Sequence, residues 1–157
     1  MDGHQALTAS IESAWEELNG SHAGRRRDLC LDAVGDVLET GRLTASEAER
    51  AVERLIGIAV CDEDHWVRES ALHAVCTAST HYALPYRVVE PLAVGVDAFE
   101  PLLLPYVLAI LGCTHDQAAL PAVERFLQHS SPDVRREAEE AVSELHWSRG
   151  SARPTAP

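Results

Sequence analysis

Histidine and cysteine are the residues of this chain best suited to bind a metal ion or to act as nucleophiles. Helical zinc sites often use two histidines four residues apart, and cysteine sites often use Cys-x-x-Cys pairs. The eight histidines include no such pair, and the four cysteines lie far apart. We therefore expect no metal site and no cofactor. The cysteines are expected to be reduced thiols of the core: Cys30, Cys61, Cys76 and Cys113.

Acid-base and nucleophilic catalysis also lack a recognisable set of residues. Serine, histidine and aspartate are present, but the Gly-x-Ser-x-Gly nucleophile motif is missing, and composition alone does not define a triad. Glu12, Glu16 and Glu17 share one predicted helix, where we interpret them as solvated surface. All 13 basic residues are arginine, which excludes a Schiff-base, P-loop or general-base lysine. We therefore favour binding over catalysis.

The chain carries a strong negative charge. Its 25 acidic and 13 basic residues give a formal net charge of -12, which repels the phosphate backbone of nucleic acids. We interpret the single basic run, Arg25-Arg26-Arg27, as a solvated face or a contact with a partner. No apolar run is long enough for a membrane helix, and the first residues do not resemble a secretory signal. We expect a cytoplasmic protein that binds neither nucleic acid nor membranes.

The spacing of the apolar residues predicts an all-α protein. Apolar residues recur three and four positions apart almost throughout, and the alternation typical of strands is not sustained. A chain of 157 residues predicts one domain, over 1–147, followed by a flexible tail over 148–157. Four prolines between 82 and 106 predict short or kinked helices there. The predicted helices cover residues 4–19, 25–40, 45–60, 65–79, 98–111, 117–129 and 132–147.

Capping residues mark several helix starts. Thr44 and Glu47 have the spacing of a capping box, and so do Asp97 and Glu100. Asp64 is placed to cap the fourth helix with its carboxylate. Two further predicted caps are Asp116 and Ser131.

A short motif recurs three times along the chain. Its pattern is Arg-x-x-(Cys or Ala)-x-x-Ala-Val, at residues 27–34, 68–75 and 135–142. The spacing places the small residues and the valine on one helical stripe, where a neighbouring helix can approach closely. A weaker copy without the arginine lies at 107–112, so we expect about four helix pairs.

This pattern resembles the HEAT repeat, loosely over about residues 4–147 and most closely over 116–145. The resemblance implies a right-handed α-solenoid of about four HEAT-like helix pairs, with an irregular third unit. It also implies that Arg68 and Arg135, and less directly Arg27, join carboxylates of the turns in a ladder between repeats. The candidate carboxylates are Asp62, Asp64, Asp116 and Asp133.

Some HEAT-related proteins are enzymes, and their site residues can be sought here. The deoxyhypusine hydroxylase type binds iron through His-Glu pairs, but the equivalent dipeptides are Glu69-Ser70 and Arg136-Glu137. Nothing marks the bilin pocket of phycobilin lyases, and HEAT-like DNA glycosylases need a basic groove, which the negative charge opposes. An enzyme with a concave pocket near Glu69 and His73 stays as an alternative.

The resemblance also predicts where a partner would bind. If the second helix of each pair lines a concave face, Asp28, Asp32 and Asp36 share one stripe on it. The equivalent stripes carry Glu69, His73 and Thr77, and then Arg136, Glu140 and Glu144. The predicted groove is acidic. The alternative interpretation is that these residues form a solvated helix face that binds no partner. Possible aromatic anchors, each of which could instead fill a repeat junction, are Trp66, Tyr82, Tyr86 and Trp147.

These observations favour a non-catalytic protein-binding module. Our leading hypothesis is an inhibitor of the immunity or antitoxin type, which covers a basic toxin or nuclease domain with an acidic concave face. The step from a HEAT-like architecture to that role is an analogy. The alternative is a scaffold or regulatory adaptor that binds its partner through the apolar, proline-rich region 82–106.

Overall fold

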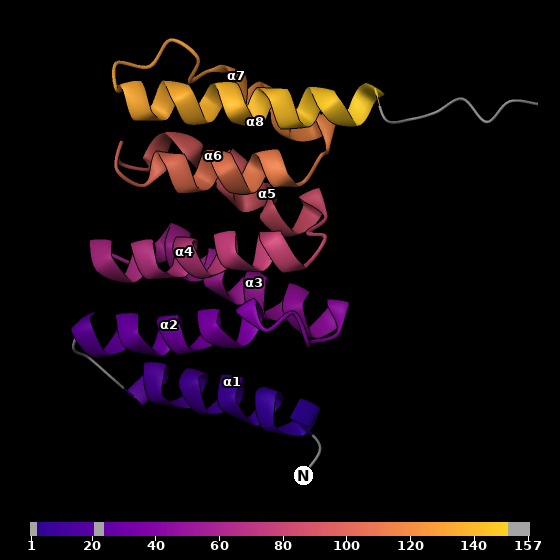
Figure 1. Cartoon of the computed structure of the whole chain (residues 1–157). Coiled ribbons are helices and arrows are strands. Elements are labelled where there is room, and N and C mark those ends of the chain that lie inside the picture. Colours follow the sequence, from indigo (N-terminus) through magenta and orange to yellow (C-terminus); the bar gives the residue numbers. More distant parts are fainter. Residues whose placement is uncertain (1–2, 21–23, 151–157) are drawn as a thin grey trace, which may run out of the picture. The chain divides into compact units, whose positions relative to one another are not determined.

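The structure, a computed structural model, describes the backbone of residues 3–20 and 24–150 (Figure 1). Side chains are described for residues 3–20 and 26–147. Within these ranges every regular element is a helix, which confirms the all-α prediction. The chain divides into two compact units, Met1–Ala83 and Leu84–Pro157. No helix of the described residues is long and apolar enough to cross a membrane.

The first unit contains two helix pairs. Helix α1 (Gly3–Gly20) packs on α2 (Gly24–Glu39), and α3 (Ala45–Cys61) packs on α4 (His65–His81). Helices α2 and α4 also pack on each other, so that α2 lies between α1 and α4 (Figure 1). Fully buried Leu31, Leu38, Leu55 and Leu72 form part of the core between these helices. The apolar spacing of each sequence segment therefore translates into one buried stripe per helix.

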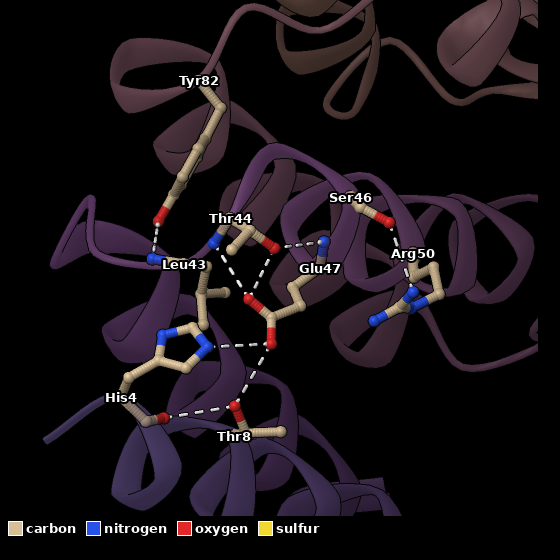
Figure 2. Close-up of polar contacts among 8 residues, drawn as sticks. All are labelled: His4, Thr8, Leu43, Thr44, Ser46, Glu47, Arg50 and Tyr82. Atoms are coloured by element: carbon tan, nitrogen blue, oxygen red, sulfur yellow. Dashed lines mark hydrogen bonds and ion pairs between the residues drawn. The ribbon is translucent and has the colours of Figure 1, made fainter. Parts of the chain in front are cut away.

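The predicted caps of the first unit are confirmed. The Thr44 hydroxyl accepts a hydrogen bond from the Glu47 amide (3.3 Å), and Glu47 Oε2 accepts one from the Thr44 amide (2.9 Å; Figure 2). Asp64 caps α4 by accepting from the amides of Trp66 and Val67. Gly41 has a φ of 63°, the left-handed conformation that glycine adopts readily, and it starts the turn into α3.

The second unit has more irregular helices. Helix α5 (Tyr86–Val94) and the 3-10 helix η1 (Val96–Ala98) lead to α6 (Leu104–Cys113), and η2 (Gln117–Ala119) leads to the short α7 (Leu120–Glu124). Helix α8 (Pro132–Gly150) closes the described chain. Helix α6 packs on both α5 and α8, and α7 packs on α8 (Figure 1).

Three sequence predictions fail in the second unit. The helix expected from about residue 98 starts only at Leu104, because Pro101 and Pro105 lack amide donors and Pro105 is accommodated in the first turn of α6. Asp97 lies in η1 and caps no α-helix. The helix expected over 117–129 is reduced to η2 and α7, because amides after Val123 bond three residues back, as in Phe126 to Val123.

The predicted close helix crossings are confirmed inside each unit. A Cβ at Gly35 of α2 would lie 3.4 Å from the Ala74 Cβ of α4. A Cβ at Gly112 of α6 would lie only 2.9 Å from both Cα and Cβ of Ala141 in α8. Ala74 and Ala141 occupy the same position of the repeated motif. In α4 and α8 the motif alanines Ala74 and Ala141 therefore lie at close helix crossings, whereas in α2 the residue at the crossing is Gly35, just after the motif.

The three motif arginines satisfy oxygens at the ends of neighbouring segments. Arg27 forms an ion pair with Asp62, as the ladder prediction requires. Arg68 Nε donates to the Ala59 carbonyl (2.8 Å), and Arg135 donates to the carbonyls of His129 (2.6 Å) and Ser130 (3.0 Å). Arg135 thus binds carbonyls at a position where we expected a carboxylate, because the segment ending at Ser130 leaves backbone acceptors unpaired.

The thiol prediction needs a correction. All four cysteines are free, but only Cys30 is buried, while Cys76 is partly buried and Cys61 and Cys113 are exposed. Cys61 and Cys113 are the last residues of α3 and α6, where the helices run out of the core. Residues 148–150, which we expected in the tail, belong to α8; residues 151–157 lie outside the described part of the chain.

Candidate functional site: acidic faces of the second helices

In the first unit the predicted stripes lie on two helices that pack together. Asp32 and Asp36 of α2 and His73 of α4 are exposed. Partly buried residues complete the stripes: Asp28, Glu69 and Thr77. The crossing at Gly35 and Ala74 holds α2 against α4, so the two stripes belong to neighbouring helices. Together the two stripes carry four carboxylates, those of Asp28, Asp32, Asp36 and Glu69, and the imidazole of His73.

In the second unit a groove lies between α6 and α8, with a volume of about 500 Å³. The α6 wall contributes Ala109, Gly112 and Cys113, which are small and leave space beside the crossing. The α8 wall is acidic and contributes Arg136, Glu137, Glu139, Glu140, Ala141, Ser143 and Glu144. Two predicted residues, Glu140 and Glu144, therefore line one groove.

The charges of this groove are poorly balanced. Four carboxylates line it, and the one guanidinium among its lining residues, that of Arg136, is already engaged with Asp133 at 3.1 Å. His115 Nδ1 lies 3.8 Å from Glu144 Oε2. A groove of this composition favours a cationic occupant.

The pKa of Glu137 is affected by the negative charge of the groove. Burial raises the pKa of the Glu137 carboxyl, and the Glu140 carboxylate raises it further, while Arg136 acts in the opposite direction. An added cation in the groove would stabilise the ionised form of Glu137 and lower this pKa. The groove is therefore a place where a basic side chain would relieve an existing electrostatic cost.

Sequence reasoning missed part of this groove. Glu137 and Glu139 were not among the predicted residues, since the predicted stripe followed a spacing of four from Arg136. The signal in the sequence was the motif alanine Ala141: a close crossing at an alanine leaves grooves on its flanks, and residues on either side of that alanine line them.

The four predicted aromatic anchors lie in different surroundings. Trp66 and Trp147 are 65% and 69% exposed, so both present most of their rings to solvent. The Tyr82 hydroxyl accepts a hydrogen bond from the Leu43 amide (3.2 Å) and holds the turn before α3 (Figure 2). Tyr86 is partly buried, and burial together with the charges of nearby carboxylates raises its pKa. Trp66 and Tyr82 belong to the first unit, and Tyr86 and Trp147 to the second.

The basic run at the start of α2 is engaged inside the first unit. Arg26 donates to Glu17 of α1 from Nε (2.9 Å) and from a terminal nitrogen (2.8 Å). Arg27 is bound to Asp62. The side chain of Arg25 lies outside the described residues. The described part of this run thus connects helices, where we had expected a solvated face or a partner contact.

Among residues 3–20 and 26–147, no group of three or more His, Cys, Asp or Glu side chains is arranged to hold a metal ion. Comparison with known proteins adds no assignment: no protein-family model matches this sequence, and no curated protein matches it significantly.

Proposed function

We propose that the chain is a HEAT-like repeat protein whose pairs α1–α2, α3–α4, α5–α6 and α7–α8 follow one another as a right-handed α-solenoid with an irregular third unit. Three observations support the proposal. The repeated motif falls on α2, α4 and α8, its alanines Ala74 and Ala141 lie at close crossings, and its arginines bind the ends of adjacent segments. These are the contacts that a stacked helical repeat requires.

We infer that the chain acts by binding a basic protein, without catalysis. The observation that carries the inference is the groove between α6 and α8, in which four glutamates face one guanidinium that Asp133 already engages. Arginine side chains of a partner would form charge-assisted, two-pronged hydrogen bonds with such carboxylates. The net charge of -12 would also attract a basic partner and raise its association rate by about 10-fold to 1,000-fold at low salt.

The specific role that we propose is inhibition of the immunity or antitoxin type. A compact, acidic helical protein can cover the cationic surface with which a nuclease or toxin domain holds its substrate. The negative charge of this surface supports the proposal, because it repels the phosphate backbone of nucleic acids and attracts the basic proteins that bind nucleic acids. The partner of such an inhibitor is expected to be a strongly basic protein.

The experiment measures binding of a fluorescent arginine-rich peptide at about 20 and 200 mM salt, since ionic contacts weaken across this range. The test variant carries Glu139→Gln, Glu140→Gln and Glu144→Gln. A matched control carries Glu16→Gln, Glu53→Gln and Glu63→Gln, which are exposed in the first unit and change the net charge equally.

We expect the groove variant to bind about tenfold or more weakly, and the control to stay within about twofold of the unchanged protein. Equal weakening of both variants would show that net charge alone attracts the peptide. No binding at low salt would end the proposal. The inhibitory role is tested next by adding the protein to a basic nuclease encoded beside it and measuring cleavage.

The adaptor alternative is favoured by one specific observation. Val94 and Leu102 in the proline-rich region are 80% and 75% exposed, so both apolar side chains are accessible to a partner. Val94→Asp with Leu102→Asp would abolish binding to a partner that docks there. Charge reversal at Asp32 and Glu140 would leave that binding intact, whereas it would disrupt binding at the acidic faces.

A further inference from the structure

The first unit contains a cavity of about 230 Å³ between α1 and α3, which the proposed function does not use. Its walls are single stripes of two helices, at residues 8, 11, 12 and 15 of α1 and 47, 50, 51 and 54 of α3. Buried Ile11, Trp15 and Leu43 form an apolar floor. The rim carries charges of both signs: Glu12, Glu47, Arg50 and Arg54.

The two arginines of the rim have neutral partners. Arg50 donates to Ser46 Oγ (3.2 Å), and Arg54 donates to Asn19 Oδ1 (3.3 Å) while its guanidinium carbon lies 4.4 Å from the centroid of the Trp15 ring. Neither guanidinium contacts a carboxylate among the described residues. Other arginines of this acidic chain do, such as Arg26 and Arg125. The cavity therefore holds two guanidinium charges that an anionic group can still approach.

The two glutamates of the rim differ. The Glu47 carboxylate is engaged by the amide and hydroxyl of Thr44, by the His4 ring (3.1 Å) and by the Thr8 hydroxyl (3.4 Å; Figure 2). Glu12, on the α1 wall, is exposed and has no hydrogen-bond partner among the described residues. Glu12 is thus the carboxylate that is open to a ligand, and Arg50 and Arg54 belong to the other helix.

We propose that this cavity binds a small zwitterion with an apolar side chain, a free apolar amino acid. Its carboxylate pairs with Arg50 and Arg54, its ammonium group pairs with Glu12, and its side chain covers the floor at Ile11 and Trp15. The size is adequate, because an apolar cavity of about 150 Å³ already holds benzene. This ligand uses the apolar floor and both open charges of the rim at once.

The test measures the heat of binding when the full chain is titrated with L-phenylalanine and with two analogues. 3-Phenylpropanoate lacks the ammonium group, and 2-phenylethylamine lacks the carboxylate. We expect saturable binding of phenylalanine, with each analogue about tenfold or more weaker because one charged hydrogen-bond partner is missing. Bound ligand joins α1 to α3, so the melting temperature should rise with phenylalanine concentration.

Variants locate the site. Arg50→Gln and Glu12→Gln should each weaken phenylalanine binding about tenfold, whereas Arg42→Gln and Glu16→Gln, exposed residues of the same unit that do not line the cavity, should leave it unchanged. Circular dichroism of each unliganded variant confirms folding, which exposed substitutions should not disturb. Absence of saturable heat up to tens of millimolar phenylalanine, or equal binding by Arg50→Gln and the unchanged protein, would overturn the proposal.

Discussion

The Arg27 guanidinium of α2 grips both carboxylate oxygens of Asp62, which lies 35 residues later at the C-terminal cap of α3. Asp62 also accepts a hydrogen bond from the Asp64 amide (3.0 Å) in the turn into α4. One ion pair therefore connects α2 with the turn between α3 and α4. Burial by itself would raise the pKa of Asp62, but the hydrogen bonds from Arg27 and from the turn amides outweigh it and hold the pKa below its ordinary value.

Arg27→Gln should lower the free energy of unfolding at neutral pH by about 1 kcal/mol, since the pair is only partly shielded from water. A lowered carboxyl pKa gives stability that is present above the unfolded pKa and is lost as the pH falls through the folded pKa. The urea midpoints of the variant and the unchanged protein should therefore converge as the pH falls below the ordinary carboxyl pKa. A constant difference across the pH range would contradict a role for Asp62 ionisation.

The glycines of α3 and α6 should respond oppositely to alanine. Gly112→Ala places a Cβ 2.9 Å from the Ala141 backbone, which must move, and should cost about 1 to 3 kcal/mol. At Gly57 a Cβ meets no described atom within 4 Å, so Gly57→Ala should stabilise the helix by up to about 1 kcal/mol. Thermal unfolding of the two variants provides the comparison, and equal effects would show that the α6–α8 crossing is looser than described.

Glu137→Gln should stabilise the protein at neutral pH. Because the pKa of Glu137 is raised, the folded state disfavours its ionised form, and stability falls as the pH rises through the raised value. The uncharged glutamine side chain avoids this loss and should raise the free energy of unfolding by a few tenths of a kcal/mol, after allowance for solvent screening. This gain in stability should disappear below the ordinary carboxyl pKa. Glu124→Gln, at an exposed position of the same unit, is the control. Melting temperatures at about pH 4 and pH 7 test the sign.

Tyr82→Phe separates a structural role from a binding role. The change leaves the Leu43 amide without its acceptor and should cost about 1 kcal/mol of stability, with no effect on binding of an arginine-rich peptide. Tyr86→Phe removes a hydroxyl that has no hydrogen-bond partner among the described residues and should change stability less. Lost peptide binding with unchanged stability in Tyr82→Phe would identify Tyr82 as an anchor for a partner.

The difference between α3 and α7 shows where sequence interpretation succeeds. The start of α3 depends on Thr44 and Glu47, which bond to each other within one helical turn, and the sequence predicted it correctly. The segment after Val123 carries helical periodicity, yet its amides bond three residues back. An α-helix and a 3-10 turn both place apolar residues toward a core, so the periodicity of the sequence does not distinguish them. Helix α7 packs on α8, and the sequence alone does not reveal this contact.

The sequence by itself determined the helical class, the caps at Thr44 and Asp64 and the repeated alanines, because these depend on residues that lie close together along one helix. Only the tertiary structure decided which groups meet across long separations. It joined Arg27 to Asp62, exposed Cys61 and Cys113, gathered four glutamates beside the Gly112 crossing, and formed the cavity at Trp15. Such contacts depend on how the side chains of distant helices share volume and charge, and no local spacing encodes that outcome.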